Sequence, residues 1–323
     1  MDRNLALNLV RVTEAAALES ARYLGRGDKN LADQAAVNGM RKMFDTLTID
    51  GVVVIGEGEM DEAPMLYIGE QIGKATPGSI KVDIAVDPLD GTAAVAQGRA
   101  NAISVVAIAP RGCLLHAPDM YMNKIAVGPK VKGKVNLDMP IGEIIKNTAE
   151  ALNKSISDIT VTMLDRPRHQ KIMEEVRKAG ARIKLFTDGD VAAAIATCFE
   201  NSGVDILLGI GGAPEGVIAA AAIKCLGGDF QGRLHPMNDE EVERCKKMGI
   251  PDVNKLFTLD DLVKGNEVMF AATGVTDGEL LKGVVYYENN RARTSSVVMR
   301  AETGTVRFIE SIHRLDKKPG YAK

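Results

Sequence analysis

Three stretches decide the fold: ITVTMLD at 159–165, ARIKLFTDGD at 181–190 and VDILLGIGGAPE at 204–215. Each opens with a short run rich in apolar and β-branched residues, which is typical of a buried strand, and closes on turn-forming residues. Helical patterns flank these strands, at 141–153, 169–179, 190–199 and 216–226. Regular alternation of strands and helices predicts a parallel sheet covered by helices, which is an α/β fold.

The three predicted strands lead into polar loops at their carboxyl ends. These loops are DRPRH at 165–169, TDGD at 187–190 and GIGGAPE at 209–215. Open α/β sheets bind ligands beyond the carboxyl ends of their strands. We therefore expect these loops to line a binding site.

The rest of the chain is less regular, and we expect two domains in all, since a domain averages roughly 150 residues. The Gly- and Lys-rich stretch GPKVKGK at 128–134 is the most plausible boundary, giving domains 1–130 and 131–323. The expected helices are 3–24, 31–47 and 64–74, the expected strands are 52–56 and 80–86, a helix-like segment is 233–265, and several strand-like runs fall within 267–312.

Composition and charge exclude several classes of protein. The chain of 323 residues is 46% hydrophobic and 26% charged, as in ordinary globular proteins, and its net charge of −3 gives no basic footprint for nucleic acid. Its four cysteines form no CxxC pair, so no zinc knuckle or disulfide framework is indicated. The N-terminus lacks a signal-peptide pattern, and glycines and Glu215 interrupt the longest apolar span, 206–223. We expect a cytoplasmic protein that binds neither nucleic acid nor membrane.

The motif DPLDGT at 87–92 follows the predicted strand 80–86 directly. Its proline forces a turn or extended conformation, so the carboxylates of Asp87 and Asp90 can converge with the intervening Leu89 carbonyl on one cation. Gly91 permits close approach of the backbone, and a helix beginning near Thr92, capped by Asp90 or Thr92, could attract a phosphate. Asp, Pro and Gly are also common turn residues, so a turn without chemistry is the alternative.

Three further carboxylates can join this motif. Asp33 lies on the apolar stripe of the predicted helix 31–47, Glu57 lies in the acidic turn GEGEMDE after a hydrophobic strand, and Glu215 begins an apolar helix. A helix dipole or cap would also explain Asp33 or Glu215, and a solvated loop would explain Glu57. Together, the carboxylates would repel one another in one pocket unless cations neutralised them. Oxygen ligands alone suit Mg²⁺ or Mn²⁺, and a cluster of two or three ions suits phosphoryl displacement.

The strand-end loops supply groups that could hold the rest of a phosphorylated sugar. Pro167 would keep its segment extended and project Arg166 and Arg168 the same way, toward a second phosphate. Asp188 and Asp190 could bind sugar hydroxyls or form a turn and helix cap, Arg166 and Arg168 could form only a solvated basic loop, and Tyr121 could contact phosphate or simply pack.

Other catalytic classes have little support in the sequence. The four histidines are dispersed, without the HExxH spacing of a zinc enzyme. Gly209 and Gly211 are the only hint of a nucleotide-binding loop, and no P-loop motif is present. An oxidoreductase is therefore a weak alternative.

The motifs together resemble a known superfamily, the lithium-sensitive, magnesium-dependent phosphomonoesterases. Longer strings resemble one of its families, the class II (GlpX-type) fructose-1,6-bisphosphatases, over most of the chain. These strings are GRGDKNLADQAAV at 25–37, VVIGEGEMDEAPMLYIGE at 53–70, HAPDMYMNKIAVGP at 116–129 and GIGGAPEGV at 209–217.

The resemblance implies a two-domain sugar-phosphatase fold, a layered α-β-α-β-α sandwich, with metal-binding and catalysis in 1–130 and sugar-phosphate binding in 131–323. It implies two or three Mg²⁺ or Mn²⁺ ions on Asp33, Glu57, Asp87, Asp90 and Glu215. The substrate-binding residues that it implies are Asp90, Gly91, Thr92, Tyr121, Arg166, Pro167, Arg168, Asp188, Gly189, Asp190 and Gly212.

The activity implied is removal of the 1-phosphate of fructose 1,6-bisphosphate, a step of gluconeogenesis, by a homo-oligomer, dimeric or tetrameric. We expect Thr92 to orient or deprotonate the attacking water, backed by an acidic neighbour such as Glu59. Alternatives are a sedoheptulose-1,7-bisphosphatase or dual-specificity enzyme, a phosphatase for inositol or nucleotide monophosphates, and a non-enzymatic module that binds cations or carbohydrate.

Overall fold

The computed structural model describes residues 1–58 and 64–318. The chain forms two compact units: unit 1 comprises Met1–Leu114 and Gly265–Lys323, and unit 2 comprises Leu115–Lys264. This division differs from the expected domains 1–130 and 131–323. The reason is that β10 (Met269–Gly274) pairs with β4 (Ile103–Pro110), which returns the end of the chain to unit 1. The α/β layered fold class itself is confirmed.

In the described part of unit 1, one eight-stranded sheet has the order β11-β12-β10-β4-β3-β1-β2, with β13 paired to β12. Only β1 and β3 run parallel, and the other pairs are antiparallel. The remaining strands of unit 1 are β1 (Ile49–Ile55), β2 (Gln71–Ile72), β3 (Ile80–Asp90), β11 (Val285–Tyr287), β12 (Arg291–Arg300) and β13 (Thr305–Arg314).

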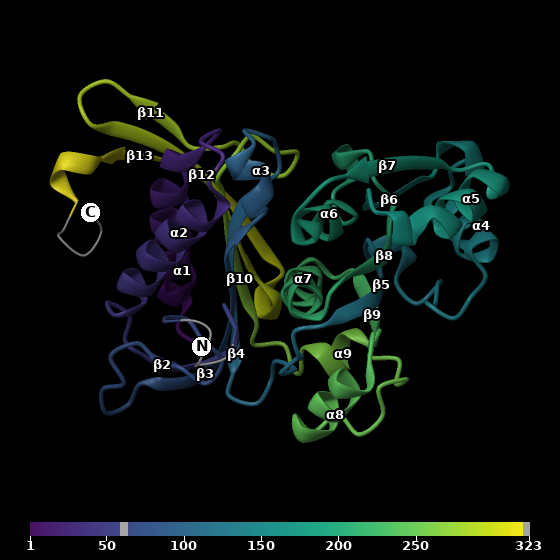
Figure 1. Cartoon of the computed structure of the whole chain (residues 1–323), viewed down its shortest axis with the longest axis horizontal. Helices are drawn as coiled ribbons and strands as arrows, with labels where there is room; N and C mark the ends of the chain where they lie inside the picture. Colours follow the sequence, from purple (N-terminus) through teal and green to yellow (C-terminus); the bar gives the residue numbers. More distant parts are fainter. Residues whose placement is uncertain (59–63, 319–323) are drawn as a thin grey trace. The chain divides into compact units, whose positions relative to one another are not determined.

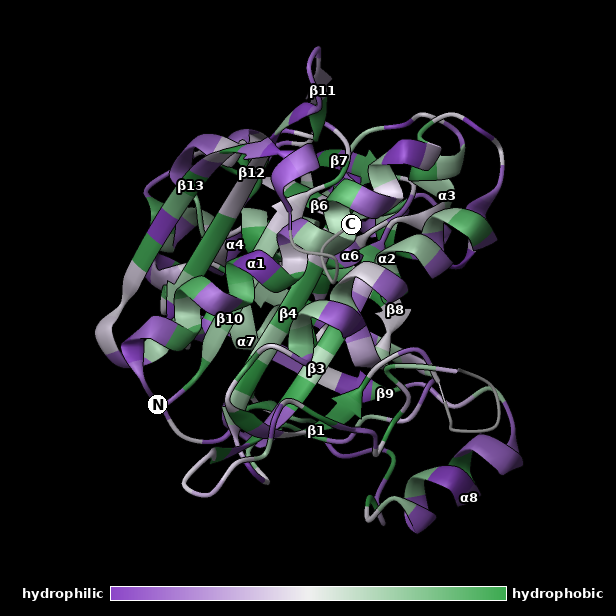
Figure 2. Cartoon of the chain, turned by 90° about the vertical axis from the view of Figure 1, so that its left-hand side faces the viewer, coloured by the Kyte–Doolittle hydropathy of each residue, from purple (hydrophilic) through white to green (hydrophobic). Residues whose placement is uncertain are grey.

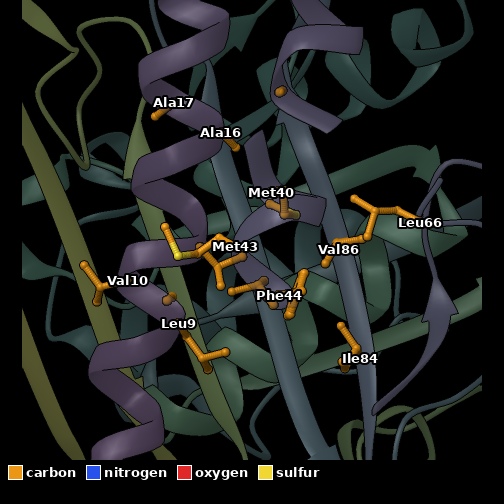
Figure 3. Packing of buried hydrophobic residues seen from close by; sticks show 14 of the residues in the cluster. Leu9, Val10, Ala16, Ala17, Met40, Met43, Phe44, Leu66, Ile84 and Val86 are labelled. Atoms are coloured by element: carbon orange, nitrogen blue, oxygen red, sulfur yellow. The ribbon is translucent and has the colours of Figure 1, made fainter. Parts of the chain in front are cut away.

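Two long helices pack on this sheet, α1 (Arg3–Ser20) and α2 (Lys29–Phe44), and they lie side by side in Figure 1. The Asp28 carboxylate caps α2 by accepting from the Asn30 and Leu31 N–H groups, so the helix begins two residues before the expected start. Figure 3 shows the packing between the helices and β3, with Leu9, Met40, Phe44, Ile84 and Val86 among the labelled residues.

Unit 2 is built on a five-stranded sheet with the order β7-β6-β8-β5-β9, in the residues that the structure describes. The neighbouring strands β7, β6 and β8 are parallel, as the alternation predicted, and β5 pairs antiparallel with both β8 and β9. The strands are β5 (Tyr121–Val127), β6 (Thr160–Leu164), β7 (Arg182–Phe186), β8 (Ile206–Gly212) and β9 (Asp229–Leu234).

Helices cover both faces of this second sheet, with α4 and α5 on one side and α6 and α7 on the other (Figure 1). Because β6, β7 and β8 are parallel, their carboxyl ends lie at one edge of the sheet. The strands are largely apolar, whereas helices such as α8 expose polar faces (Figure 2). The helices are α3 (Thr92–Ala96) in unit 1 and α4 (Ile141–Leu152), α5 (Gln170–Ala179), α6 (Asp190–Ala196), α7 (Ala213–Leu226), α8 (Asp239–Lys247) and α9 (Leu259–Leu262) in unit 2.

The helix expected at 64–74 is wrong. Leu66, Gly69 and Gly73 have positive φ angles, which a right-handed helix cannot contain. The Glu70 carboxylate instead accepts from the Leu66 N–H and pairs with Arg41 at 2.6 Å, which holds this segment as a turn before β2. No helix in residues 1–58 and 64–318 is long and apolar enough to cross a membrane.

Candidate active site

The DPLD segment ends β3 in a β-bulge. Asp87 pairs with Val105 of β4, and Asp90 pairs with Ile103, so three residue steps on β3 match two on β4. Residues two apart on a strand share a face, so the extra residue puts both aspartates on one face of the sheet. Without the bulge, residues three apart would point to opposite faces. Proline is tolerated at such a position because the ladder is already interrupted.

The step from β3 into α3 requires glycine. Gly91 has φ of 104° and ψ of 42°, in the left-handed region, and a Cβ there would lie 3.1 Å from Ala102. Gly91 is itself the N-cap of α3, so neither Asp90 nor Thr92 holds the expected capping position. Thr92 is the first residue of α3, half-buried, directly after the two aspartates.

Asp33 and Glu57 meet in unit 1. Asp33 projects from α2, and Glu57 follows the end of β1, so that the two carboxyl groups interact directly. Burial raises the pKa of Asp33. Burial, with the charge of Asp33, raises the pKa of Glu57 to about 8. Two buried carboxyl groups that cannot both ionise beside each other suit a divalent cation, which would replace the proton between them.

The acidic residues of unit 1 do not all have described surroundings. Glu59, expected to back Thr92, lies outside the described residues, as do the other acidic residues of the turn after Gly58. Within residues 1–58 and 64–318, no group of three or more His, Cys, Asp or Glu side chains is arranged to hold a metal ion. The described geometry therefore supports a carboxyl pair, Asp33 with Glu57, and a bulge carrying Asp87 and Asp90.

Unit 2 contains a second group of buried charges. Lys124 of β5, with only 3% of its side chain exposed, donates to Asp190 Oδ2 at 2.6 Å. Asp190 Oδ1 and Glu215 Oε2 are buried, and neither has a hydrogen-bond partner among the described residues. Burial, then the nearby Asp190 charge, raises the pKa of Glu215, while Lys124 acts against this rise. A buried carboxylate oxygen without a partner is costly, so Glu215 fits a cation ligand.

Two glycines make room for these carboxylates. A Cβ on Gly211 would lie 2.0 Å from Asp190 Oδ2, and a Cβ on Gly212 would lie 1.8 Å from Glu215 Oε2. The need to accommodate Glu215, in the first turn of α7, therefore explains why glycine stands at position 212. Gly189, at φ of 76°, is the N-cap of α6, so neither Asp188 nor Asp190 caps that helix by its side chain.

Arg168 and Tyr121 lie together at the same edge of the unit 2 sheet. The Arg168 guanidinium lies 4.7 Å from the centre of the Tyr121 ring, and it donates from Nε and Nη2 to the Ile210 carbonyl. Tyr121 pairs with Gly212 in the ladder between β5 and β8. A cation over an aromatic face is attracted to it, so Tyr121 and Ile210 together fix the direction of Arg168.

The expectation that Pro167 holds this loop extended is only partly right. Arg166 is extended, but Pro167–His169 form the 3-10 turn η4. The two arginines therefore have different partners: Arg166 donates to the Asp165 carbonyl, and Arg168 donates to Ile210.

Sequence reasoning missed two residues of unit 2. Lys124 lies within an apolar strand, where an isolated lysine needs a buried anion, and this could have signalled its role. His169 is completely buried, and its ring hydrogen-bonds to backbone groups of Leu164 and Ile210. Nothing in the dispersed histidine pattern distinguishes it from the others.

Comparison with known proteins identifies the family of the chain. The family described as "Bacterial fructose-1,6-bisphosphatase, glpX-encoded" matches residues 3–313. The chain is 49% identical over 331 aligned positions to fructose-1,6-bisphosphatase 1 class 2 of Escherichia coli strain K12, with 98% of this chain and 97% of the relative covered. Fructose-1,6-bisphosphatase class 2 of Shigella flexneri is similar to the same extent. The chain belongs to the glpX-encoded family of bacterial fructose-1,6-bisphosphatases.

Proposed function

We propose that this protein hydrolyses the 1-phosphate of fructose 1,6-bisphosphate, giving fructose 6-phosphate and inorganic phosphate. The observation that carries the proposal is the buried carboxyl pair Asp33–Glu57 in a chain that belongs to this family of phosphatases. We further propose a cytoplasmic homo-oligomer as the working form. The test below compares this substrate with sedoheptulose 1,7-bisphosphate and with the monophosphates.

Unit 1 supplies the metal-binding and catalytic part of the chemistry. We assign Asp33, Glu57, Asp87 and Asp90 of unit 1 to bind Mg²⁺ or Mn²⁺, with the Leu89 carbonyl as a further oxygen donor. In unit 2 we assign Glu215 as a cation ligand. Bound divalent cations polarise a phosphoryl group and lower the pKa of water.

Thr92 is the residue of this chain that orients the attacking water. Its hydroxyl can donate one hydrogen bond and accept another, which suits a group that holds water in line with a phosphorus–oxygen bond. The left-handed turn at Gly91 leads directly from Asp90 to Thr92, the first residue of α3. No covalent intermediate with the protein is needed.

Unit 2 supplies recognition of the sugar and of its second phosphate. We assign Arg166 and Arg168 to that phosphate, since guanidinium groups bind phosphate through paired N–H donors. Tyr121 supports Arg168 by stacking. Asp190 Oδ1 is buried, and an acceptor of this kind can bind a sugar hydroxyl; Asp188, Gly189 and Gly212 complete the proposed contacts.

A substrate panel tests the proposed function. Phosphate release is measured with fructose 1,6-bisphosphate, sedoheptulose 1,7-bisphosphate, inositol monophosphate and a nucleoside monophosphate, each with Mg²⁺ and with Mn²⁺. We expect the highest kcat/KM with fructose 1,6-bisphosphate. A higher value with another substrate would reassign the enzyme within the same reaction class.

The matched control for this panel uses two neutral substitutions. Glu57→Gln should abolish turnover. Asp45→Asn changes an exposed carboxylate just after α2, which pairs with Arg41, and should leave turnover intact. Full activity in Glu57→Gln would reject the assigned metal-binding role.

A further inference from the structure

His169 joins the end of β6 to the exit of β8. Its Nδ1 lies 2.7 Å from the Leu164 carbonyl oxygen at the end of β6, and its Nε2 lies 2.8 Å from the Ile210 N–H nitrogen in β8. The side chain is fully buried. One imidazole ring therefore bridges β6 and β8.

These two partners fix the tautomer of the ring. A carbonyl only accepts a hydrogen bond, so Nδ1 must carry a proton and donate it to Leu164. An amide N–H only donates, so Nε2 must be unprotonated to accept from Ile210. His169 is therefore neutral with its proton on Nδ1, and burial, which lowers its pKa, acts in the same direction.

Gly209 is shaped to the ring. A Cβ on Gly209 would lie 3.0 Å from His169 Nε2 and 3.3 Å from Cε1, closer than ordinary packing allows. The first glycine of the GIGG stretch thus accommodates the imidazole ring, as the later two accommodate Asp190 and Glu215.

Consecutive residues of η4 hold both backbone groups of Ile210. His169 accepts from its N–H, and Arg168 donates Nε and Nη2 to its carbonyl at 3.1 and 2.9 Å. These two bonds use one edge of the guanidinium. The other edge, formed by Nη1 and the second Nη2 proton, remains available to donate two hydrogen bonds to a phosphate. The direction of that edge depends on where Ile210 lies relative to η4.

We propose that His169 is a positioning residue, which holds Arg168 in the orientation that binds the second phosphate of the substrate. This inference rests on the proposed function, in which Arg168 contacts that phosphate. Loss of the two ring hydrogen bonds would let η4 shift relative to β8. A smaller fraction of the Arg168 side-chain conformations would then be able to bind the phosphate. The effect belongs to substrate affinity and not to the chemical step.

The test uses His169→Phe, which keeps an aromatic ring and removes both hydrogen bonds, and His169→Gln, whose side-chain oxygen can still accept from Ile210. We expect KM for fructose 1,6-bisphosphate to rise on the order of tenfold in His169→Phe, the scale of one lost buried hydrogen bond, with a smaller rise in His169→Gln. The change in kcat should be much smaller than the change in KM. The double variant His169→Phe with Arg168→Ala should have the KM of Arg168→Ala alone.

The control is His313→Phe, because His313 is also buried and its ring contacts Thr294 at 2.8 Å. It should lose stability without a change in KM. An unchanged KM in both His169 variants, or additive effects in the double variant, would overturn the inference while Arg168→Ala still raised KM. If Arg168→Ala itself left KM unchanged, the proposed binding of the second phosphate would fail instead.

A second measurement does not depend on activity. Nitrogen-15 NMR of the histidine side chains should show one ring in the neutral form protonated at Nδ1, and its signals should vanish in both His169 variants. Protonation of that ring at Nε2 would refute the two hydrogen bonds.

Discussion

Binding of a divalent cation to this protein should release protons, in a number that depends on pH. Burial together with the Asp33 charge raises the pKa of Glu57 to about 8. Metal ligation needs the ionised carboxylate. With that pKa, about 0.9 of the Glu57 carboxyls carry a proton at pH 7 and about 0.1 at pH 9, so cation binding should release about those numbers of protons.

Calorimetry with Mg²⁺ measures this release directly. At each pH the titration is repeated in two buffers of different ionisation enthalpy, and the difference in binding heat gives the protons released. The apparent association constant should rise about tenfold per pH unit below pH 8 and level off above it. Asp45→Asn should behave as the natural protein does. Equal proton release at pH 7 and pH 9 would refute the account of the pair.

Three further predictions concern single residues. A raised carboxyl pKa favours the folded state only while the group is protonated, so without metal the natural protein should lose about 1 kcal/mol of unfolding free energy between pH 7 and pH 8. Denaturant titration in the presence of chelator should show this loss in the natural protein and not in Glu57→Gln. Thr92→Ala should lower kcat by about 10²- to 10⁴-fold with an unchanged thermal unfolding temperature, whereas Thr92→Ser should retain much of the natural kcat. Turnover at the natural rate in Thr92→Ala would refute the catalytic role of Thr92. Gly211→Ala should push Asp190 away from Lys124 and raise KM about tenfold or more. As a control, Gly142→Ala, in open space on α4, should leave KM unchanged and stabilise the protein by about 0.5–1 kcal/mol. A natural KM in Gly211→Ala would contradict the assigned role of Asp190.

The central part of the fold was predictable because its signals are local. Apolar runs that end in Gly, Asp or Pro mark β6, β7 and β8, and a parallel sheet then brings their exits to one edge. The prediction of a helix at 64–74 failed because the Glu70 carboxylate binds the Leu66 N–H in a local turn and the distant Arg41 in a tertiary contact, and these outweigh helical spacing.

The candidate site was predictable in its residue types but not in its geometry. A bulge depends on the partner strand, so the shared face of Asp87 and Asp90 is visible only in the register with β4. Lys124 and His169 act on residues far along the chain, at Asp190 and Ile210, and local sequence carries little trace of such contacts. The C-terminal strands likewise return to unit 1 through long-range pairing.

The most direct measurement is phosphorus-31 NMR of fructose 1,6-bisphosphate incubated with the purified protein, with Mg²⁺ or Mn²⁺ and with chelator. The account predicts that the resonance of the 1-phosphate is replaced by inorganic phosphate while the 6-phosphate remains, and that chelator stops the reaction. Release of the 6-phosphate, or no release with either cation, would contradict it.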